Sequence, residues 1–393
     1  MSVPAVSFRN VDILFGRDAR LGLELLDRGA TRNEILQKTG VVLGCADATL
    51  DVGEGDICVL MGLSGSGKST LVRAVNGLNR PNRGRVLVKD GDGVVDVAGC
   101  DEQVLRRIRM SRVAMVFQQF ALLPWRTVEQ NVGFGLELSG IAEAERLQRV
   151  SKQLELVGLE QWAHKYAHEL SGGMQQRVGL ARAFATEAPI LLMDEPFSAL
   201  DPLIRTHLQD ELLILQKSLR RTIIFVSHDL DEALKIGTRI AIMEAGRVVQ
   251  YGAPQDIVLR PANEYVANFV AHMNPLNVLT GDVMMRRLVD LKQGEETIVV
   301  DALRQLTLQL SRSGAPEGAK LAGKPVTVFP TEMNGVKVPA LHLAVMPAGT
   351  PMRAIIEARQ TTGLPVLLAE GSKVIGVVGD EEIYSALMHR VHS

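Results

Sequence analysis

The sequence predicts an α/β protein built on a largely parallel β-sheet, followed by a smaller α+β domain. From about residue 5 to 275, short apolar runs rich in branched residues alternate with longer helical stretches. This alternation is typical of parallel sheets whose faces are covered by helices. The rhythm is lost after about residue 275, which predicts a first domain over 1–275 and a second over 276–393. The candidate strands of the first domain are 56–61, 113–118, 189–194 and 222–227.

Composition and charge narrow the class of protein. The 393-residue chain has 46% hydrophobic and 22% charged residues, as globular proteins do. Its formal net charge of −2 gives no reason to expect nucleic acid as a partner. Cys45, Cys58 and Cys100 form no CxxC pair, so we expect buried, reduced thiols. Neither a signal peptide nor an apolar run of about 18 residues is recognisable, so we expect no membrane span.

A glycine-rich motif provides the first chemical signal. The stretch GLSGSGKS at 62–69 matches GxxxxGK[ST] and lies between a predicted strand and a predicted helix. Glycines let backbone amides curl around phosphate oxygens, and the helix N-terminus adds partial positive charge. Lys68 would reach the β- and γ-phosphates of a nucleotide, and Ser69 would ligate Mg²⁺. The alternative is an ordinary glycine-rich turn. The predicted contacts of this motif are Gly62, Ser64, Gly65, Ser66, Gly67, Lys68, Ser69 and Thr70.

Polar residues at the ends of other predicted strands fit the same site. The run ILLMDEP at 190–196 ends in two acids: Asp194 could hold Mg²⁺, and Glu195 could polarise the attacking water. Gln118 ends the strand VAMVFQ and could contact the Mg²⁺ or the water. His228 follows the strand TIIFVS and could bond the γ-phosphate. The alternatives are solvated acids and structurally satisfied polar residues.

A second glycine-rich turn, LSGGMQQR at 170–177, completes an ordered set of motifs with SALD at 198–201. This set resembles that of the ATP-binding cassette (ABC) ATPases over about residues 5–270. The resemblance implies a P-loop NTPase (RecA-like) cassette with a helical subdomain at about 119–185. It also implies Glu195 as catalytic base, with His228 and Gln118 as further catalytic residues.

The resemblance further implies a homodimer with ATP and Mg²⁺ as cofactors. Ser69, Gln118 and Asp194 would be the metal ligands. The signature residues Ser171, Gly172 and Gly173, together with Asp201 of SALD, would contact the ATP that the other subunit holds. The helix after the signature would add its dipole to that contact.

Phe15 is the expected adenine-stacking aromatic, although an inserted helical segment at 17–40 separates it from the glycine loop. The alternative is a core phenylalanine. With this insert, the cassette resembles those of importers of glycine betaine, proline betaine, choline or carnitine, most closely the choline/betaine branch. An importer of another small solute, or a non-transport ABC ATPase, remains the alternative.

The importer resemblance implies partners and a location. We expect a transmembrane permease, a periplasmic or extracellular substrate-binding protein acting through it, and a peripheral position on the cytoplasmic face of the inner (plasma) membrane. The apolar stretch at 120–138 is either a groove for the permease or core of the helical subdomain. In this stretch the candidate contacts are Phe120, Leu122, Leu123, Pro124 and Trp125.

The second domain resembles a degenerate cystathionine-β-synthase-type (CBS) regulatory domain. The segment 339–390 predicts strand, helix, strand, strand, helix, as one such module has. A first module over about 278–335 is expected mainly from two short stretches, and 311–330 is predicted to be a loop because it is rich in Gly, Ser and Pro. The alternative function is a dimerising or stabilising tail.

Overall fold

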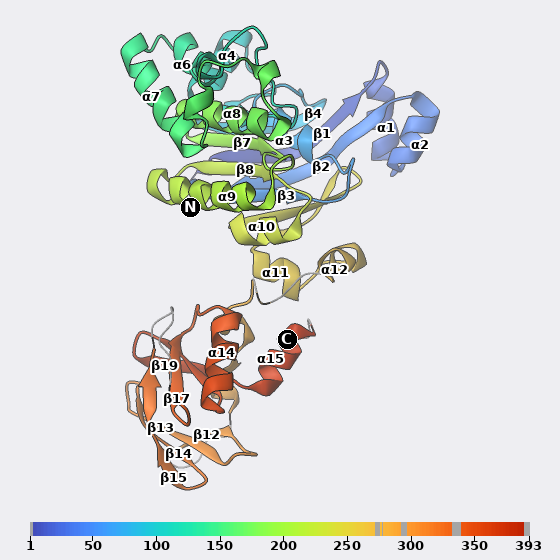
Figure 1. Ribbon diagram of the computed structural model, residues 1–393. Coiled ribbons are helices and arrows are strands. Elements are labelled where there is room, and N and C mark those ends of the chain that lie inside the picture. Colours follow the sequence, from blue (N-terminus) through green and yellow to red (C-terminus); the bar gives the residue numbers. More distant parts are fainter. Residues whose placement is uncertain (1–2, 272–275, 277, 292–296, 332–338, 389–393) are drawn as a thin grey trace. The chain divides into compact units, whose positions relative to one another are not determined.

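The computed structural model describes residues 3–271, 276, 278–291, 297–331 and 339–388 (Figure 1). The described residues form two compact units, Met1–Ala253 and Pro254–Ser393, each with its own apolar core. The division lies earlier than the boundary near 275 predicted from composition, and 272–275 are outside the described residues. Helices α11 (Pro254–Leu259) and α12 (Glu264–Val270) contact each other, and Gln255 Nε2 donates to Thr280 Oγ1 of the second unit.

A parallel sheet forms the centre of the first unit, in the order β10-β9-β3-β8-β7-β6. All four predicted strands are confirmed, and only β10 at one edge runs antiparallel to its neighbour. The strands β3, β7 and β8 are buried along their whole length, which explains why their sequences are continuous apolar runs. The strands are β3 (Ile57–Met61), β6 (Val113–Val116), β7 (Ile190–Asp194), β8 (Thr222–Val226), β9 (Arg239–Glu244) and β10 (Arg247–Gly252).

A second, antiparallel sheet has the order β2-β1-β4-β5. The predicted insert lies inside its first hairpin, where Phe15 and Val42 are paired across the strands. The hairpin connection contains α1 (Ala19–Asp27) and α2 (Arg32–Thr39), which confirms the expected helical segment. The insert shares a small apolar core with the hairpin, including the fully buried Ile35. The strands are β1 (Val6–Phe15), β2 (Val42–Val52), β4 (Arg83–Asp90) and β5 (Gly93–Asp96).

Helices complete the first unit. Helix α3 (Lys68–Val75) follows the glycine loop, and α8 (Gly172–Ala185) follows the signature serine. The predicted helical subdomain is the green region around α6, α7 and α8 in Figure 1. The remaining helices are α4 (Glu102–Ser111), α5 (Val128–Val132), α6 (Phe134–Leu138), α7 (Glu143–Leu156), α9 (Pro202–Leu219) and α10 (Leu230–Ile236).

The second unit contains the predicted strand–helix–strand–strand–helix segment. Strands β17 and β18 are parallel, and β19 returns antiparallel to β18. Their inward residues form part of this unit's core. The elements are β17 (Leu343–Pro347), α14 (Met352–Thr362), β18 (Val366–Glu370), β19 (Lys373–Val378) and α15 (Asp380–Leu387).

The loop predicted at 311–330 was wrong. This region forms strands of an antiparallel meander with the order β12-β13-β14-β15, followed by β16, which joins the other sheet. Gly314 and Gly323 have positive φ and mark turns, while Ala319 between them is buried. Within 278–291 and 297–331, the described elements of the expected first CBS module do not follow the strand–helix–strand–strand–helix order. The meander and its neighbours are α13 (Gly281–Met284), β11 (Arg286–Arg287), β12 (Ile298–Asp301), β13 (Leu306–Leu310), β14 (Pro316–Leu321), β15 (Lys324–Val326) and β16 (Val328–Pro330).

The sequence predictions also concerned the three cysteines and membrane-spanning helices. Cys45 and Cys58 are buried as predicted, and burial raises the pKa of each thiol to about 12. Cys100 is only half-buried. Within the described part of the chain, no helix combines the length and the apolar character that crossing a membrane requires.

Candidate nucleotide-binding site

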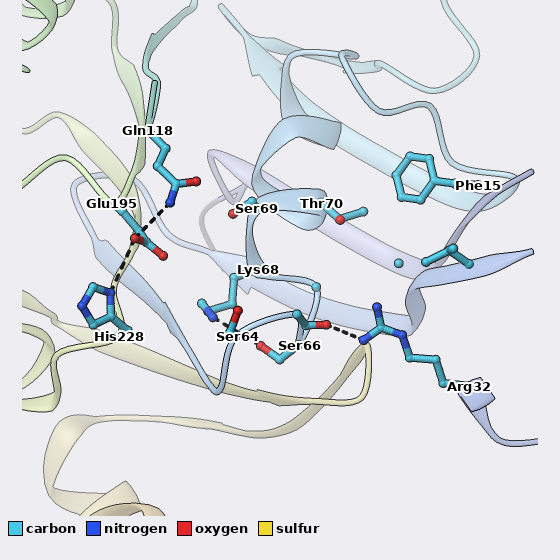
Figure 2. A pocket seen from close by; sticks show the side chains of 14 residues that line it. Phe15, Arg32, Ser64, Ser66, Lys68, Ser69, Thr70, Gln118, Glu195 and His228 are labelled. Atoms are coloured by element: carbon cyan, nitrogen blue, oxygen red, sulfur yellow. Dashed lines mark hydrogen bonds and ion pairs between the residues drawn. The ribbon is translucent and has the colours of Figure 1, made fainter. Parts of the chain in front are cut away.

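A cavity of about 470 Å³ opens where the glycine loop meets the ends of β6, β7 and β8. Figure 2 shows residues from these separate segments turned toward one space. This is the position at which open α/β sheets bind ligands, beyond the carboxyl ends of their strands. The lining residues are Phe15, Arg32, Val42, Gly44, Ser64, Gly65, Ser66, Gly67, Lys68, Ser69, Thr70, Gln118, Glu195 and His228.

The glycine loop needs glycine at specific positions. Gly62 has a φ of 141°, and a Cβ there would lie 2.1 Å from the Met243 carbonyl oxygen. Gly67 has a φ of 100°, and its Cβ would lie 2.3 Å from the Gly44 carbonyl oxygen. Both contacts are with backbone that cannot move aside, so any side chain at either position would displace the loop.

Lys68 closes the loop on itself. Its Nζ donates to the carbonyl oxygens of Gly62 at 2.8 Å and Leu63 at 3.0 Å. Burial lowers the pKa of Lys68, and the carboxylates of Glu195 and Asp194 oppose that shift. Lys68 lines the same cavity as the loop residues 64–67, where phosphate binding requires a cation.

The oxygen ligands expected for Mg²⁺ lie next to the loop. Ser69 Oγ donates to Asp194 Oδ1 at 2.7 Å, and Arg73 Nη2 donates to Asp194 Oδ2 at 2.8 Å. Asp194 is fully buried. Among the described residues, no group of three or more His, Cys, Asp or Glu could hold a metal. The Ser69 hydroxyl and the Asp194 carboxylate are oxygen donors, which suits Mg²⁺ carried in by a nucleotide.

Glu195 is the meeting point of the polar strand ends. Gln118 Nε2 donates to Glu195 Oε2 at 3.3 Å, and His228 Nδ1 lies 3.5 Å from the same oxygen (Figure 2). Glu195 has a φ of 50°, an uncommon conformation for glutamate, and its amide donates to the Val226 carbonyl at 3.2 Å. A backbone outlier of this kind is typical of residues held for a function.

Phe15 lies in the cavity wall and is 42% exposed. A Cβ on Gly44 would lie 2.7 Å from Phe15 Cε2 and 2.9 Å from Thr70 Cγ2. Gly44 therefore lets the ring sit above the loop's helix. The Phe15–Val42 pairing also explains the long sequence interval, because the insert occupies only the connection between the paired strands.

The signature residues do not reach this cavity. Ser171 caps α8 by accepting a bond from the Met174 amide at 3.4 Å, and Gly172 is exposed. Gly173 lies close to Ala199, at the start of the SALD turn. Asp201 caps α9 and accepts from the Ile204 amide at 3.0 Å. Within one chain the structure thus separates Ser171, Gly172, Gly173 and Asp201 from the predicted phosphate contacts.

Gln176, which was not among the predicted site residues, joins the helical subdomain to the residue that follows β7. The side chain is fully buried; its Nε2 donates to the Glu195 carbonyl at 3.2 Å, and its Oε1 accepts from the Ala199 amide at 3.0 Å. Its place in LSGGMQQR was the available signal. Arg73 and Arg32 were also missed, and no motif marks either of them.

The fold and this site define a P-loop nucleotide-binding protein. The family model for "ABC transporter" matches residues 45–198. Solved structures of the ATP-binding cassette MJ0796, one bound to ADP and Pi and both dimeric, have a TM-score of 0.55. The first is 29% identical and covers 63% of this chain and 98% of that one.

Proteins of similar sequence identify the group of ABC transporter proteins to which this chain is related. The chain is 52% identical over 279 residues to the glycine betaine/proline betaine transport system ATP-binding protein ProV of Salmonella typhimurium, covering 71% of this chain and 69% of that protein. It is 40% identical to the glycine betaine/carnitine transport ATP-binding protein GbuA of Listeria monocytogenes, covering 95% of both chains. The choline transport ATP-binding protein OpuBA of Bacillus subtilis is 38% identical, covering 68% of both. The chain belongs to this family of ABC transporter ATP-binding subunits.

The Gln176 bonds generate a prediction. Gln176→Leu roughly keeps the side-chain size but removes the two hydrogen bonds to the Glu195 carbonyl and the Ala199 amide. We expect a loss of about 1–3 kcal/mol in the free energy of unfolding and a fall in kcat, because Glu195 loses its support. Urea unfolding and steady-state ATPase assays measure both. Gln103→Leu, at an exposed position on α4, is the matched control and should change neither. Equal stability of both variants would contradict the bonding role.

Proposed function

We propose that this protein is the ATP-hydrolysing subunit of an importer for quaternary ammonium solutes, working as a homodimer bound to a permease. The observation that carries the proposal is the convergence of Gln118 and His228 on Glu195, beside Ser69 and Asp194. Phosphoryl transfer to water needs a base, a metal-binding oxygen pair and a phosphate cradle in one cavity. The members of this family hydrolyse ATP by means of such a site.

Each group has a distinct task in this proposal. The amides of the glycine loop and Lys68 hold the β- and γ-phosphates, while Ser69, Asp194 and Gln118 would hold Mg²⁺. That ion, when bound, neutralises charge on the phosphates. Glu195 accepts a proton from the attacking water, and its approach to Gln118 and His228 limits where that water can stand. Phe15 stacks on the adenine from the wall of the cavity.

The dimer is supported by a glycine that its own chain does not require. A Cβ on Gly172 would meet nothing within 4 Å, and Gly172 is absent from the positive-φ glycines. Neither local space nor backbone conformation accounts for glycine there. An ATP phosphate brought by a second subunit does, because it would approach the Ser171 hydroxyl and the first amides of α8. In this arrangement Gly173 and Asp201 lie at the same interface.

The permease is proposed to dock in an apolar groove of about 400 Å³. Leu123 and Phe134 of the helical subdomain and Met110 of α4 line this groove. Arg182 fixes the nearby turn by donating to the carbonyls of Phe120 and Ala121. Of the other candidate contacts, Phe120 and Leu122 are half-buried, while Pro124 and Trp125 are exposed. A helix from a membrane partner suits a groove of this kind, which gives the chain a peripheral position on the cytoplasmic face of the inner (plasma) membrane.

The substrate class is inferred from the relatives. ProV is named for transport of glycine betaine and proline betaine, GbuA for glycine betaine and carnitine, and OpuBA for choline. We therefore infer glycine betaine or a related quaternary amine as the solute, delivered by a substrate-binding protein through the permease. Import of another small solute is the second candidate. The cassette itself has no part in recognising the solute.

The second unit is proposed to regulate the ATPase as a degenerate CBS-like domain. Its support is the strand–helix–strand–strand–helix order of β17 to α15. The meander β12–β15 occupies the part of the sequence in which the other module was expected. A purely stabilising tail is the competing role.

Glu195→Gln tests the hydrolytic role directly. The amide cannot accept the proton of the attacking water, so kcat should fall at least about a hundredfold, the low end of what a general base contributes. ATP binding should persist and stabilise a dimer, measurable by size-exclusion chromatography with ATP. The exposed Glu24→Gln on α1 is the control. Intact ATPase activity in Glu195→Gln would remove Glu195 from the mechanism.

A mixing experiment tests the composite site. Ser171→Arg retains the phosphate loop of its own subunit but obstructs the partner's ATP, and Lys68→Ala does the reverse. We expect each variant alone to be inactive. A mixture forms heterodimers with one site that has both an intact loop and an intact signature, so ATPase activity should reappear. A Ser171→Arg protein that hydrolyses ATP normally by itself would contradict the shared site.

The solute is tested in cells. Deletion of the gene should lower uptake of labelled glycine betaine, because the permease then has no ATPase. The wild-type gene should restore uptake, and the Glu195→Gln allele should not. Competition by unlabelled choline, carnitine and proline betaine ranks the solutes. Unchanged uptake of all four after deletion would reject the substrate class.

A further inference from the structure

We propose that Arg32, contributed by the insert in the β1–β2 hairpin, binds the diphosphate part of the nucleotide. No sequence motif marks this residue, and none of the comparisons assigns it a role. The inference rests on the proposed ATP binding and adds a contact from outside the motifs. It gives the insert a function in nucleotide affinity.

Arg32 lies at the edge of the phosphate cradle. It is the first residue of α2, and its Nη1 donates to the carbonyl oxygen of Gly65 at the tip of the glycine loop. Its side chain lines the cavity together with Phe15 and Lys68. Figure 2 shows the guanidinium extending from the insert toward the loop. The space beside Gly65 is otherwise empty, because a Cβ built on this residue would have only Arg32 Nη1 within 4 Å, at 3.9 Å.

The charge of Arg32 is not neutralised by the protein. Among the described residues, no carboxylate lies within ion-pair distance of this guanidinium, and the Gly65 carbonyl is its one hydrogen-bond partner. Two other arginines, Arg20 of the insert and Arg83 beside it, are by contrast paired with Glu24 and Asp27. A guanidinium has five N–H donors, so most of those of Arg32 remain for a ligand. Diphosphate oxygens are the acceptors that match an arginine in such a cavity.

The insert holds Arg32 in place rather than leaving it on a free loop. Thr31 and Glu34 form a capping box at the start of α2, and Gly40 ends the helix in the left-handed conformation. Ile35 is fully buried in the core that the insert shares with β1 and β2. The same hairpin carries Phe15, so one element positions both the ring proposed to stack on the adenine and the guanidinium of Arg32.

The position of Arg32 also determines which kinetic constant it should affect. In Figure 2 it lies on the Phe15 side of the cavity, opposite Gln118, Glu195 and His228. A contact with the α- or β-phosphate is present in ATP, in the transition state and in ADP alike. Such uniform binding lowers KM and leaves kcat nearly unchanged.

Arg32→Ala in the full-length chain tests the proposal. We expect the Kd values for ATP and ADP to rise by about the same factor, roughly tenfold for the loss of a charged hydrogen bond. KM should rise in parallel while kcat stays within about twofold, and adenosine affinity should not change, because adenosine has no phosphate. Arg32→Lys should recover part of the affinity. Lys38→Ala, an exposed cation on the same helix, is the matched control.

The outcomes separate this proposal from the proposed function. If wild-type and Lys38→Ala bind ATP and Arg32→Ala binds ATP and ADP equally well, the role of Arg32 is refuted and the ATPase function stands. An equal loss for adenosine, or a fall confined to kcat, would also overturn the diphosphate contact. If the wild-type chain binds neither nucleotide, the proposed function itself fails.

Discussion

The buried carboxylate of Asp194 is the constraint on which the cassette depends. Removing a charge from water costs several kcal/mol unless partners replace the solvent. Both partners, Ser69 and Arg73, come from α3, so the phosphate-loop helix is tied to the end of β7. The loop itself is shaped by contacts with backbone that leave no room for a side chain at Gly62 or Gly67. The phosphate cradle and the metal-binding acid are thus fitted to each other by the fold.

The end of β7 also positions the other polar groups of the site. One residue beyond Asp194, the left-handed backbone of Glu195 turns its carboxylate toward Gln118 and His228. Its carbonyl, facing the other way, is held by Gln176 of the signature helix. The carboxylate proposed as the base and the helix proposed to face a second subunit are therefore connected through Glu195. Gln176 thus links helix α8 directly to the backbone of Glu195.

The sequence predicted what is local. The strands β3, β6, β7 and β8 were recognisable because buried parallel strands are continuous apolar runs, and the phosphate loop because its turn requires glycine. Contacts made by residues outside the motifs were not predictable: the Arg32–Gly65 bond spans 33 residues, and nothing in the sequence marks Arg32. The long interval between Phe15 and the glycine loop is explained only by the register of β1 and β2. The 311–330 segment was mistaken for a loop because Gly and Pro mark tight hairpins as well as irregular connections.

The place of the insert has a consequence for how the family can vary. Because Phe15 and Val42 are paired across the hairpin, the segment between them protrudes from two strands whose pairing is already complete. Closure entropy grows only with the logarithm of loop length, so lengthening a tight turn to this segment costs only about 2 kcal/mol. Burial of Leu26 and Ile35 against the hairpin offsets that cost. The segment between the paired strands can therefore change in length during evolution without changing the pairing of the sheet. Because this segment carries Arg32, such changes would alter the affinity for the nucleotide under the proposal made above.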